Sequence, residues 1–252
     1  MKKYLVLVCF LAVSQDCLGI VNIEDGNWQL TENGNALNLF ASLEGSSGNT
    51  EKQSFSLGGR WQVKHDEVSA FIIADGEYGE SSGATNTNKK FLHGRYISRL
   101  TSGFAWEIFG QAESDEFKRL ESRWLAGGGG RWFLADETNY QNYLGLGAFY
   151  SREKINFSNS ADSGSVSQNR LNAYWVYRSK VSDRITFLNT IYWQPSFKDS
   201  SDFRALNQFA LSIDIAEKLK WKWQTNISYD SMPPSDVEKQ DVTYSTVIEW
   251  QW

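Results

Sequence analysis

The chain has 252 residues, with 25 basic and 30 acidic side chains and a formal net charge of −5, which argues against a nucleic-acid partner. Trp, Tyr and Phe make up 15% of the residues, yet the mean hydropathy is −0.46, and no apolar run is long enough for a transmembrane helix. These values exclude a helical membrane protein. They allow a membrane β-barrel, in which only alternate residues face lipid. The length fits one domain.

The first residues have the features of a secretory signal peptide, which we assign to residues 1–19. Lys2 and Lys3 precede an apolar run of about ten residues, and Gly19 is a suitable cleavage position. The two cysteines, Cys9 and Cys17, both lie in this stretch. The mature protein is therefore expected to be exported and to have neither disulfides nor thiol chemistry.

A short periplasmic N-terminal segment with weak structure is expected at residues 20–34. After it, apolar and polar residues alternate; Leu57 and Trp61, for example, share one face of a segment, and Arg60 lies on the other. This period of two predicts strands. We expect twelve, at about 35–47, 51–63, 66–79, 88–100, 103–114, 118–134, 139–153, 168–180, 183–195, 203–215, 218–230 and 241–252.

The predicted fold is all-β, an antiparallel transmembrane β-barrel of about 12 strands that occupies residues 35–252 in the cell outer membrane. An even number of strands returns both termini to one side, which in bacterial barrels is the periplasm. The connections support this orientation because they alternate in length. Short links are expected at 64–66, 101–102, 135–138, 181–182 and 216–217, and longer ones at 46–50, 80–87, 156–167, 196–202 and 231–240, with 115–117 a short exception on the long side.

Tryptophan is concentrated near the predicted periplasmic ends of the strands, on their apolar faces. The expected aromatic girdle consists of Trp61, Trp106, Trp132, Trp221 and Trp223, together with Trp250 and Trp252. Indole rings favour a membrane interface, where they are half in water and half in lipid. A soluble barrel of opposite polarity is the alternative, but twelve strands enclose more space than the side chains of one apolar face can fill.

The last segment alternates up to the final residue. Tyr244, Ile248, Trp250 and Trp252 share its apolar face. By resemblance to outer membrane proteins in general, these four residues are expected to form the C-terminal signal that the barrel-assembly machinery recognises.

Three stretches also match a family pattern. Residues 229–252, YDSMPPSDVEKQDVTYSTVIEWQW, contain a Tyr-Asp pair, a double Pro and terminal alternation; residues 48–50 read Gly-Asn-Thr; and residues 120–133 place Arg123 before a glycine run. Over most of residues 36–252 the chain resembles the salt-induced outer membrane proteins, domain of unknown function 481. It departs from them in ending on Trp rather than Phe and in its short lead-in. The resemblance implies an outer membrane barrel and assigns no catalytic residues.

Charged side chains recur on the face opposite the apolar one, which should line the lumen. The set comprises Arg60, Arg95, Arg99, Glu107, Glu113, Glu121, Arg123, Arg131, Arg170 and Arg178. Together with the other inward charges the two signs are nearly balanced, whereas a channel selective for acidic sugars would have one sign in excess. We therefore expect ion pairs that narrow or close the lumen.

No pattern indicates an enzyme, a metal site or a cofactor. His65 is expected in a turn and His93 in the lumen, without the converging ligands of a metal site. The four glycines at 127–130 lack the Lys-Ser/Thr of a phosphate loop; in a barrel they would let a strand bend or an inward neighbour approach closely.

The expected function is a narrow or conditionally open channel for small solutes or ions with a salt-bridged lumen. One alternative is a closed structural barrel with a role in the envelope or in salt adaptation. Another is an outer membrane enzyme acting on lipids, for which we find no Ser that matches His93. The expected partners are outer membrane lipid, the barrel-assembly machinery and small solutes or ions.

Overall fold

The computed structural model describes Glu24 and residues 33–46, 52–81, 84–116, 120–155, 164–233 and 239–252. These residues contain twelve strands: β1 (Gly34–Ser46), β2 (Lys52–His65), β3 (Val68–Ser81), β4 (Ala84–Thr101), β5 (Phe104–Asp115), β6 (Leu120–Glu137), β7 (Tyr140–Ile155), β8 (Gly164–Lys180), β9 (Ile185–Pro195), β10 (Phe203–Ala216), β11 (Leu219–Asp230) and β12 (Gln240–Gln251). The predicted all-β fold and strand positions are confirmed. The expected signal peptide at 1–19 lies outside the described residues. No helix in the described part of the chain is long and apolar enough to cross a membrane.

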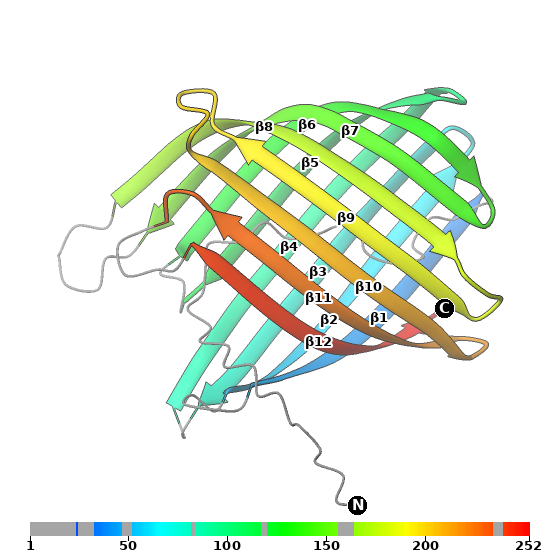
Figure 1. Ribbon diagram of the computed structural model, residues 1–252, viewed down its shortest axis with the longest axis horizontal. Coiled ribbons are helices and arrows are strands. Elements are labelled where there is room, and N and C mark those ends of the chain that lie inside the picture. The colour runs from blue at the N-terminus through cyan, green and yellow to red at the C-terminus, as the bar shows by residue number, and fades with distance from the viewer. Residues whose placement is uncertain are drawn as a thin grey trace, which may run out of the picture.

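Consecutive strands pair in antiparallel fashion, and β12 pairs with β1, which closes the sheet into a barrel (Figure 1). At the closure the backbone N–H of Trp252 donates to the carbonyl of Leu37 at 2.9 Å. The beginning of β1 and the end of β12 therefore lie at the same end of the barrel. A closed sheet leaves no strand edge unpaired, which a sheet inside a membrane requires.

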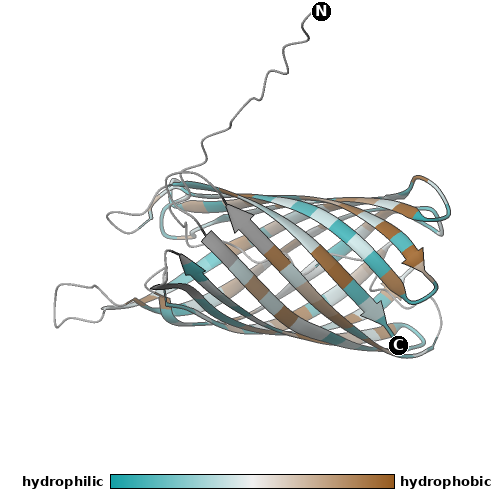
Figure 2. Ribbon diagram, turned by 90° about the horizontal axis from the view of Figure 1, so that it is seen from below, coloured by the Kyte–Doolittle hydropathy of each residue, from teal (hydrophilic) through white to brown (hydrophobic). Residues whose placement is uncertain are grey.

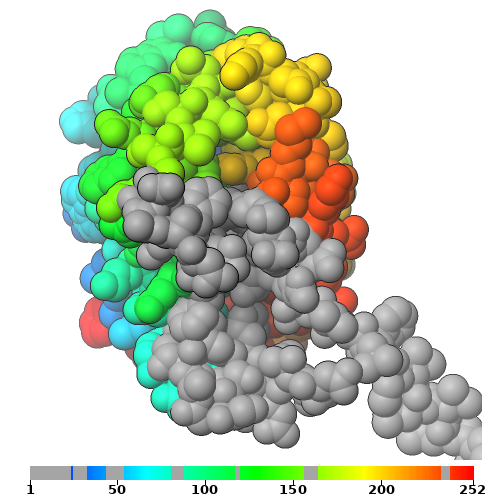
Figure 3. All heavy atoms as spheres, turned by 90° about the vertical axis from the view of Figure 1, so that its left-hand side faces the viewer, coloured from blue at the N-terminus to red at the C-terminus, as the bar shows by residue number. Residues whose placement is uncertain are grey.

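The two ends of the barrel differ in their links. At the end where β12 finishes, which we call the turn end, the strands are joined by residues 66–67, 102–103, 138–139, 181–184 and 217–218. At the opposite end, the loop end, the links are 47–51, 82–83, 116–119, 156–163, 196–202 and 231–239. Figure 3 looks onto the loop end, where residues 196–202 (yellow) form part of the rim. The long link expected at 80–87 is wrong, because the β3–β4 ladder continues to Ser81 and Ala84.

The outer surface carries apolar side chains at alternate positions. Leu57, Ile72, Ile108 and Leu146 are all exposed, and apolar and polar residues alternate along the strands in Figure 2. An apolar surface that continues from strand to strand is suited to lipid rather than to water. The barrel therefore has the polarity of a membrane barrel, not that of a soluble one.

The tryptophans of the expected girdle point outward near the turn end. Trp61, Trp106, Trp132 and Trp223 are exposed, and ladder pairs such as Trp61 with Leu37 and Trp132 with Phe104 place them close to the turns. Trp221 is half-buried, and its Nε1–H donates to Thr246 Oγ1 on the neighbouring strand β12 at 2.7 Å.

The interior contains apolar side chains as well as charges. Strands β7 to β10 contribute an inward cluster of Tyr143, Tyr174, Val176, Leu188, Tyr192, Leu206 and Ala210. Tyr174 lies against Gly145, where the Cβ of any other residue would overlap the tyrosine ring. The inside of the barrel is thus partly packed, and it is less open than the uniformly polar lumen that the alternation predicts.

Candidate functional site

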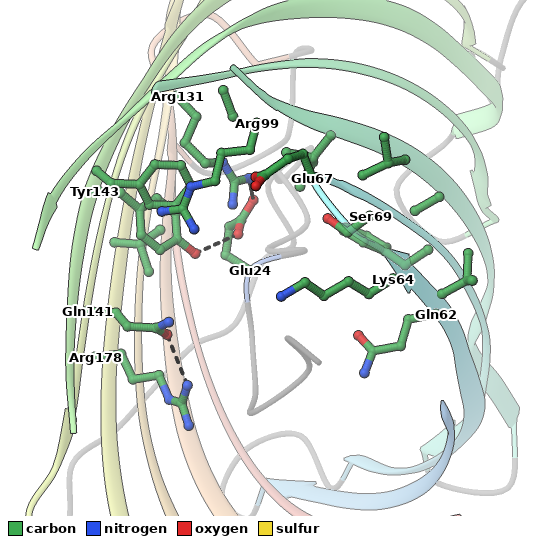
Figure 4. Close-up of a pocket in the computed structure, with 18 of the residues that line it drawn as sticks. Glu24, Gln62, Lys64, Glu67, Ser69, Arg99, Arg131, Gln141, Tyr143 and Arg178 are labelled. Carbon is green, nitrogen blue, oxygen red and sulfur yellow. Dashed lines mark hydrogen bonds and ion pairs between the residues drawn. The ribbon is translucent and has the colours of Figure 1, made fainter. Parts of the chain in front are cut away.

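Two cavities lie inside the described part of the barrel. The larger, of about 120 Å³, is at the turn end, and Lys64, Glu67 and Arg178 are among the residues that line it (Figure 4). The smaller, of about 40 Å³, lies toward the loop end and is lined in part by Arg123 and Glu153.

A layer of side chains separates the two cavities. On β5, Ala105 lines the larger cavity and Phe109 the smaller, while Glu107 lies between them and lines neither. On β8, Val176 lines the larger cavity and Asn172 the smaller, while Tyr174 lies between them and lines neither. The lumen is therefore interrupted at the level of Glu107 and Tyr174, whose side chains lie between the two cavities.

Four charged side chains lie in this layer, and we call them the central charge cluster: Glu24, Arg95, Glu107 and Arg131. Arg95 Nη1 lies 2.6 Å from Glu24 Oε1 and 3.2 Å from Glu107 Oε2. Arg131 Nη2 lies 2.7 and 2.9 Å from the same two oxygens. Each of the four side chains exposes 5% of its surface or less. Two positive and two negative charges balance here, as charges removed from water must.

Three neighbouring strands bring three of these residues to one level. Arg95 belongs to β4, Glu107 to β5 and Arg131 to β6. In the ladders Glu107 is opposite Ile97, and Arg131 is opposite Ala105. Each inward charge is therefore offset by two residues from its neighbour, and all three side chains point to the same part of the lumen.

Tyrosine hydroxyls satisfy the remaining oxygens of the carboxylates. The hydroxyl of Tyr143 donates to Glu24 Oε2 at 2.8 Å, and that of Tyr174 donates to Glu107 Oε1 at 2.8 Å. Arg131 Nε donates to the Tyr174 oxygen at 3.0 Å, and its guanidinium carbon lies 4.7 Å from the ring centre of Tyr143. A buried network whose members have partners of this kind favours one arrangement.

Glu24 is the one member of this cluster that does not belong to a strand. The expected periplasmic segment at 20–34 lies mostly outside the described residues, but Glu24 lies inside the barrel, where Arg95, Arg131 and Tyr143 hold its carboxylate. Figure 4 shows Glu24 beside Arg131 and Tyr143. Burial alone would raise the pKa of Glu24, but the charges of Arg131 and Arg95 and the Tyr143 hydrogen bond lower it to about 2. Glu24 therefore remains ionised at ordinary pH. It lies in no periodic segment, so no sequence signal identifies it.

A second group, the loop-end charge cluster, borders the smaller cavity and is formed by Glu113, Arg123, Glu153, Arg204 and Asp230. Glu153 Oε1 accepts from Arg123 Nε at 3.0 Å and from Arg204 Nη1 at 2.7 Å. Arg123 also pairs with Glu113, and Arg204 Nε lies 2.9 Å from Asp230 Oδ2. All five residues are on strands, and the pair between β7 and β10 joins strands that are not neighbours.

Four other expected lumen residues have partners that are not members of the central charge cluster, although the charge of Arg60 also acts on Glu24. The guanidinium carbon of Arg60 lies 3.7 Å from the ring centre of Phe71. Arg99 Nη2 lies 2.6 Å from Asp136 Oδ2, and Arg170 Nη2 lies 2.7 Å from Asp202 Oδ1. Arg178 Nη1 donates to Gln141 Oε1 at 3.0 Å. Arg60, Arg99 and Arg178 line the larger cavity, so this cavity has a basic wall.

Glu121 does not join the other lumen charges. A bulge between Leu120 and Ser122 inserts an extra residue into β6, so the alternation shifts by one position there. The Glu121 side chain is 47% exposed and lies 2.6 Å from Lys154 Nζ, which is 44% exposed. The expected place of Glu121 in the lumen is therefore corrected to the exposed side of β6.

Glu153 and Arg204 are interior residues that we did not identify from the sequence. Glu153 has the same inward parity as Tyr143 on β7, so consistent use of the alternation would have found it. Arg204 is the second residue of β10, where strand boundaries are hardest to predict.

His93 is buried between aromatic rings. Its ring centre lies 6.3 Å from that of Phe91 and 6.1 Å from that of Phe109, and its Nδ1 lies 3.2 Å from Gln111 Oε1. Within the described ranges no three His, Cys, Asp or Glu side chains are grouped to hold a metal ion.

At the C-terminal end of the sequence, the expected assembly signal points away from the lumen. Its members Tyr244, Ile248, Trp250 and Trp252 are all exposed on the outer face.

Comparisons with known proteins give a family and a fold. One family model, described as "Protein of unknown function, DUF481", matches residues 40–252. The structure of the COG4313 outer membrane channel from Pseudomonas putida F1 is similar with a TM-score of 0.55 and 10% identity, over 92% of this chain and 100% of that one. No curated protein sequence matches the chain.

Two further solved structures are similar at the same level of identity. The translocator domain of the autotransporter NalP from Neisseria meningitidis has a TM-score of 0.52 and 10% identity, over 89% of this chain and 90% of that one. The NanC porin has a TM-score of 0.51 and 10% identity, over 85% and 98%. Identities this low show the fold alone, which is that of outer membrane barrels.

Proposed function

This chain belongs to the DUF481 family of proteins of unknown function, as its sequence pattern predicts, and we propose that it is a narrow outer membrane channel for small solutes or ions. The apolar outer surface, the tryptophans at the turn end and the expected signal peptide support the location. In this proposal the turn end and both termini face the periplasm, because bacterial barrels have their short turns on that side.

The observation that carries the proposal is the interrupted lumen. Two cavities lie along the barrel, and only the layer that contains Glu107 and Tyr174 separates them in the described structure. Side chains can rearrange without breaking the barrel wall, whereas a lumen filled throughout its length could not open in this way. A layer of paired charges fits a pore that conducts weakly or conditionally.

A closed structural barrel, with a role in the envelope or in salt adaptation, is the second candidate. It is favoured by the inward aromatic cluster on β7 to β10 and by the many buried ion pairs, which stabilise a fixed interior. Conductance distinguishes the two candidates. If the barrel is closed, neither the wild type nor a variant with fewer contacts in the lumen should conduct.

The test is single-channel recording of purified protein in planar bilayers. Replacing Glu107 and Arg131 together, Glu107→Gln with Arg131→Gln, removes one charge of each sign from the layer and should raise the conductance. The matched control is Glu121→Gln with Lys154→Gln, which removes an exposed ion pair from the outer side of β6 and should leave conductance unchanged. Absence of current from all three proteins at every salt concentration would leave the closed barrel as the function.

The proposal treats the protein as non-enzymatic, and the same preparation tests this. Incubation with phospholipid vesicles should release no fatty acid. Hydrolysis that persists after further purification and is lost in a lumen or rim variant would replace the channel with a lipid-acting enzyme.

The barrel-assembly machinery is the proposed assembly partner, and the exposed outer face of β12 is its recognition strand. Deleting Trp252 removes the last aromatic side chain of that face, which is 67% exposed. The amount of folded protein in the outer membrane should fall, while the amount exported to the periplasm stays the same. Unaltered membrane levels, measured by heat-modifiable gel mobility, would contradict this role.

A further inference from the structure

The carboxylate of Glu24 is bound much as a protein binds a free carboxylate ligand. Its Oε1 accepts from Arg95 Nη1 at 2.6 Å and from Arg131 Nη2 at 2.7 Å, and its Oε2 accepts from the Tyr143 hydroxyl at 2.8 Å. The three donors come from β4, β6 and β7 and lie 71, 107 and 119 residues away along the chain. The strands thus provide a complete carboxylate receptor to which Glu24 itself contributes no donor.

The receptor does not depend on Glu24 for its construction. Glu107 Oε2, on β5, lies 3.2 Å from Arg95 Nη1 and 2.9 Å from Arg131 Nη2, the same two nitrogen atoms that contact Glu24. Tyr174 further holds Arg131 through its hydroxyl. Without Glu24 the two arginines would remain in place, paired with one carboxylate, and the site would have an excess of one positive charge.

We propose that Arg95, Arg131 and Tyr143 form a binding site for the carboxylate of a small solute, and that Glu24 is an internal occupant which such a solute displaces. The excess of one positive charge matches one carboxylate. This inference rests on the proposed channel function and names the solute class for that lumen.

The larger cavity gives a solute access to this site. Its lining extends from Asp66 and Glu67 at the turn between β2 and β3 to Glu24, Arg131 and Tyr143 at its inner end. In Figure 4 the Lys64, Gln62 and Gln141 side chains also border the space beside Glu24. Amide and cationic groups of this kind can bind the polar body of a solute whose carboxylate reaches the two arginines.

The tether of Glu24 sets the concentration at which a solute competes. Glu24 and β1 belong to one chain, so the Glu24 carboxylate acts at an effective concentration on the order of millimolar. A free carboxylate should therefore bind the wild type only weakly. It should bind much more tightly to a Glu24→Ala variant, in which the receptor is unoccupied.

Chemical rescue of Glu24→Ala tests the site directly. The variant is purified in detergent and its thermal unfolding is followed by tryptophan fluorescence, with acetate, gluconate, acetamide or chloride added at equal ionic strength. Acetate and gluconate at saturation should raise the unfolding midpoint by about 2–4 °C. Acetamide, which has the shape of acetate without its charge, and chloride should have less effect. A Glu24→Gln variant should not respond, because its amide still fills the site.

Two controls make the result specific. Glu121→Ala removes an exposed carboxylate and should show no response to acetate, and Glu24→Ala with Arg131→Gln should lose the response. An equal rise in all variants, or no rise in Glu24→Ala, overturns the carboxylate site.

Conductance separates this inference from the proposed function. Acetate should reduce the chloride current through Glu24→Ala. Thermal rescue without current in any variant would retain the binding site and overturn the channel. Current through Glu24→Ala without thermal rescue or acetate block would retain the channel and overturn the site.

Discussion

The two charge clusters of the lumen are built from the same chemical groups but differ in how their carboxylates are held. In the loop-end charge cluster, Glu113, Glu153 and Asp230 are fixed by strands β5, β7 and β11. In the central charge cluster, Glu107 is fixed by β5, whereas Glu24 comes from outside the strands. The barrel register therefore determines the first cluster completely. The second includes one group that can leave while the rest of the receptor remains.

The largest expected effect is the loss of a strand-borne carboxylate. Glu153→Ala removes the carboxylate that Arg123 and Arg204 share, in a site where Glu153 is 3% exposed. It leaves Arg123 with Glu113 alone and Arg204 with Asp230 alone, so that no carboxylate joins the two arginines. Removing one partner from a buried pair costs about 3–5 kcal/mol. Urea unfolding in detergent micelles should show a loss of this size. A loss below about 1 kcal/mol would mean that water reaches this cluster freely.

A smaller loss is expected for Glu24→Ala, about 1–3 kcal/mol, because Glu107 still contacts both arginines and the neighbouring cavity can admit water or an anion. The same urea experiment measures it. The difference between the clusters predicts that this loss is reduced by added acetate, whereas the loss in Glu153→Ala is not. Equal losses and equal responses would remove the distinction between them.

Lowering the pH should sharpen the comparison without a mutation. The folded pKa of Glu24, about 2, lies below its ordinary value of 4.5. Its contacts therefore contribute fully above the ordinary pKa, and their contribution decreases as the pH falls toward 2. Wild-type conductance should stay low from about pH 7 to about pH 4 and increase only below that range. An increase between about pH 6 and pH 5 would show that another group controls the lumen.

The smallest effect is expected for the exposed pair of Glu121 and Lys154. These side chains are 47% and 44% exposed, so solvent screens their attraction. Glu121→Ala should change the stability by about 0–1 kcal/mol. A loss as large as that of Glu24→Ala, measured by urea unfolding, would show that Glu121 is part of the interior after all.

Much of the barrel is predictable from the sequence because strand alternation is a local property. The twelve strands and the inward parity of Arg95, Glu107 and Arg131 follow from it directly. Glu121 shows the limit, since a single bulge between Leu120 and Ser122 moves a residue to the other face, and the local pattern does not reveal it.

The rest of the site depends on contacts between distant segments. Glu24 meets residues 71 to 119 positions away, and nothing in its own neighbourhood indicates this. The apolar side chains that strands β7 to β10 direct into the barrel were also not predicted. Inward-facing and outward-facing apolar residues look alike in a sequence. Tyr174 could not be placed against Gly145 before the register of β7 and β8 was known.

The most direct test of this account is the single-channel conductance of Glu24→Ala beside that of the wild type and of Glu121→Ala. The central claim is that side chains held around the Glu24 carboxylate interrupt the lumen. Glu24→Ala should therefore conduct more than the wild type, and Glu121→Ala should conduct the same as the wild type. Identical conductance in all three proteins would contradict the claim.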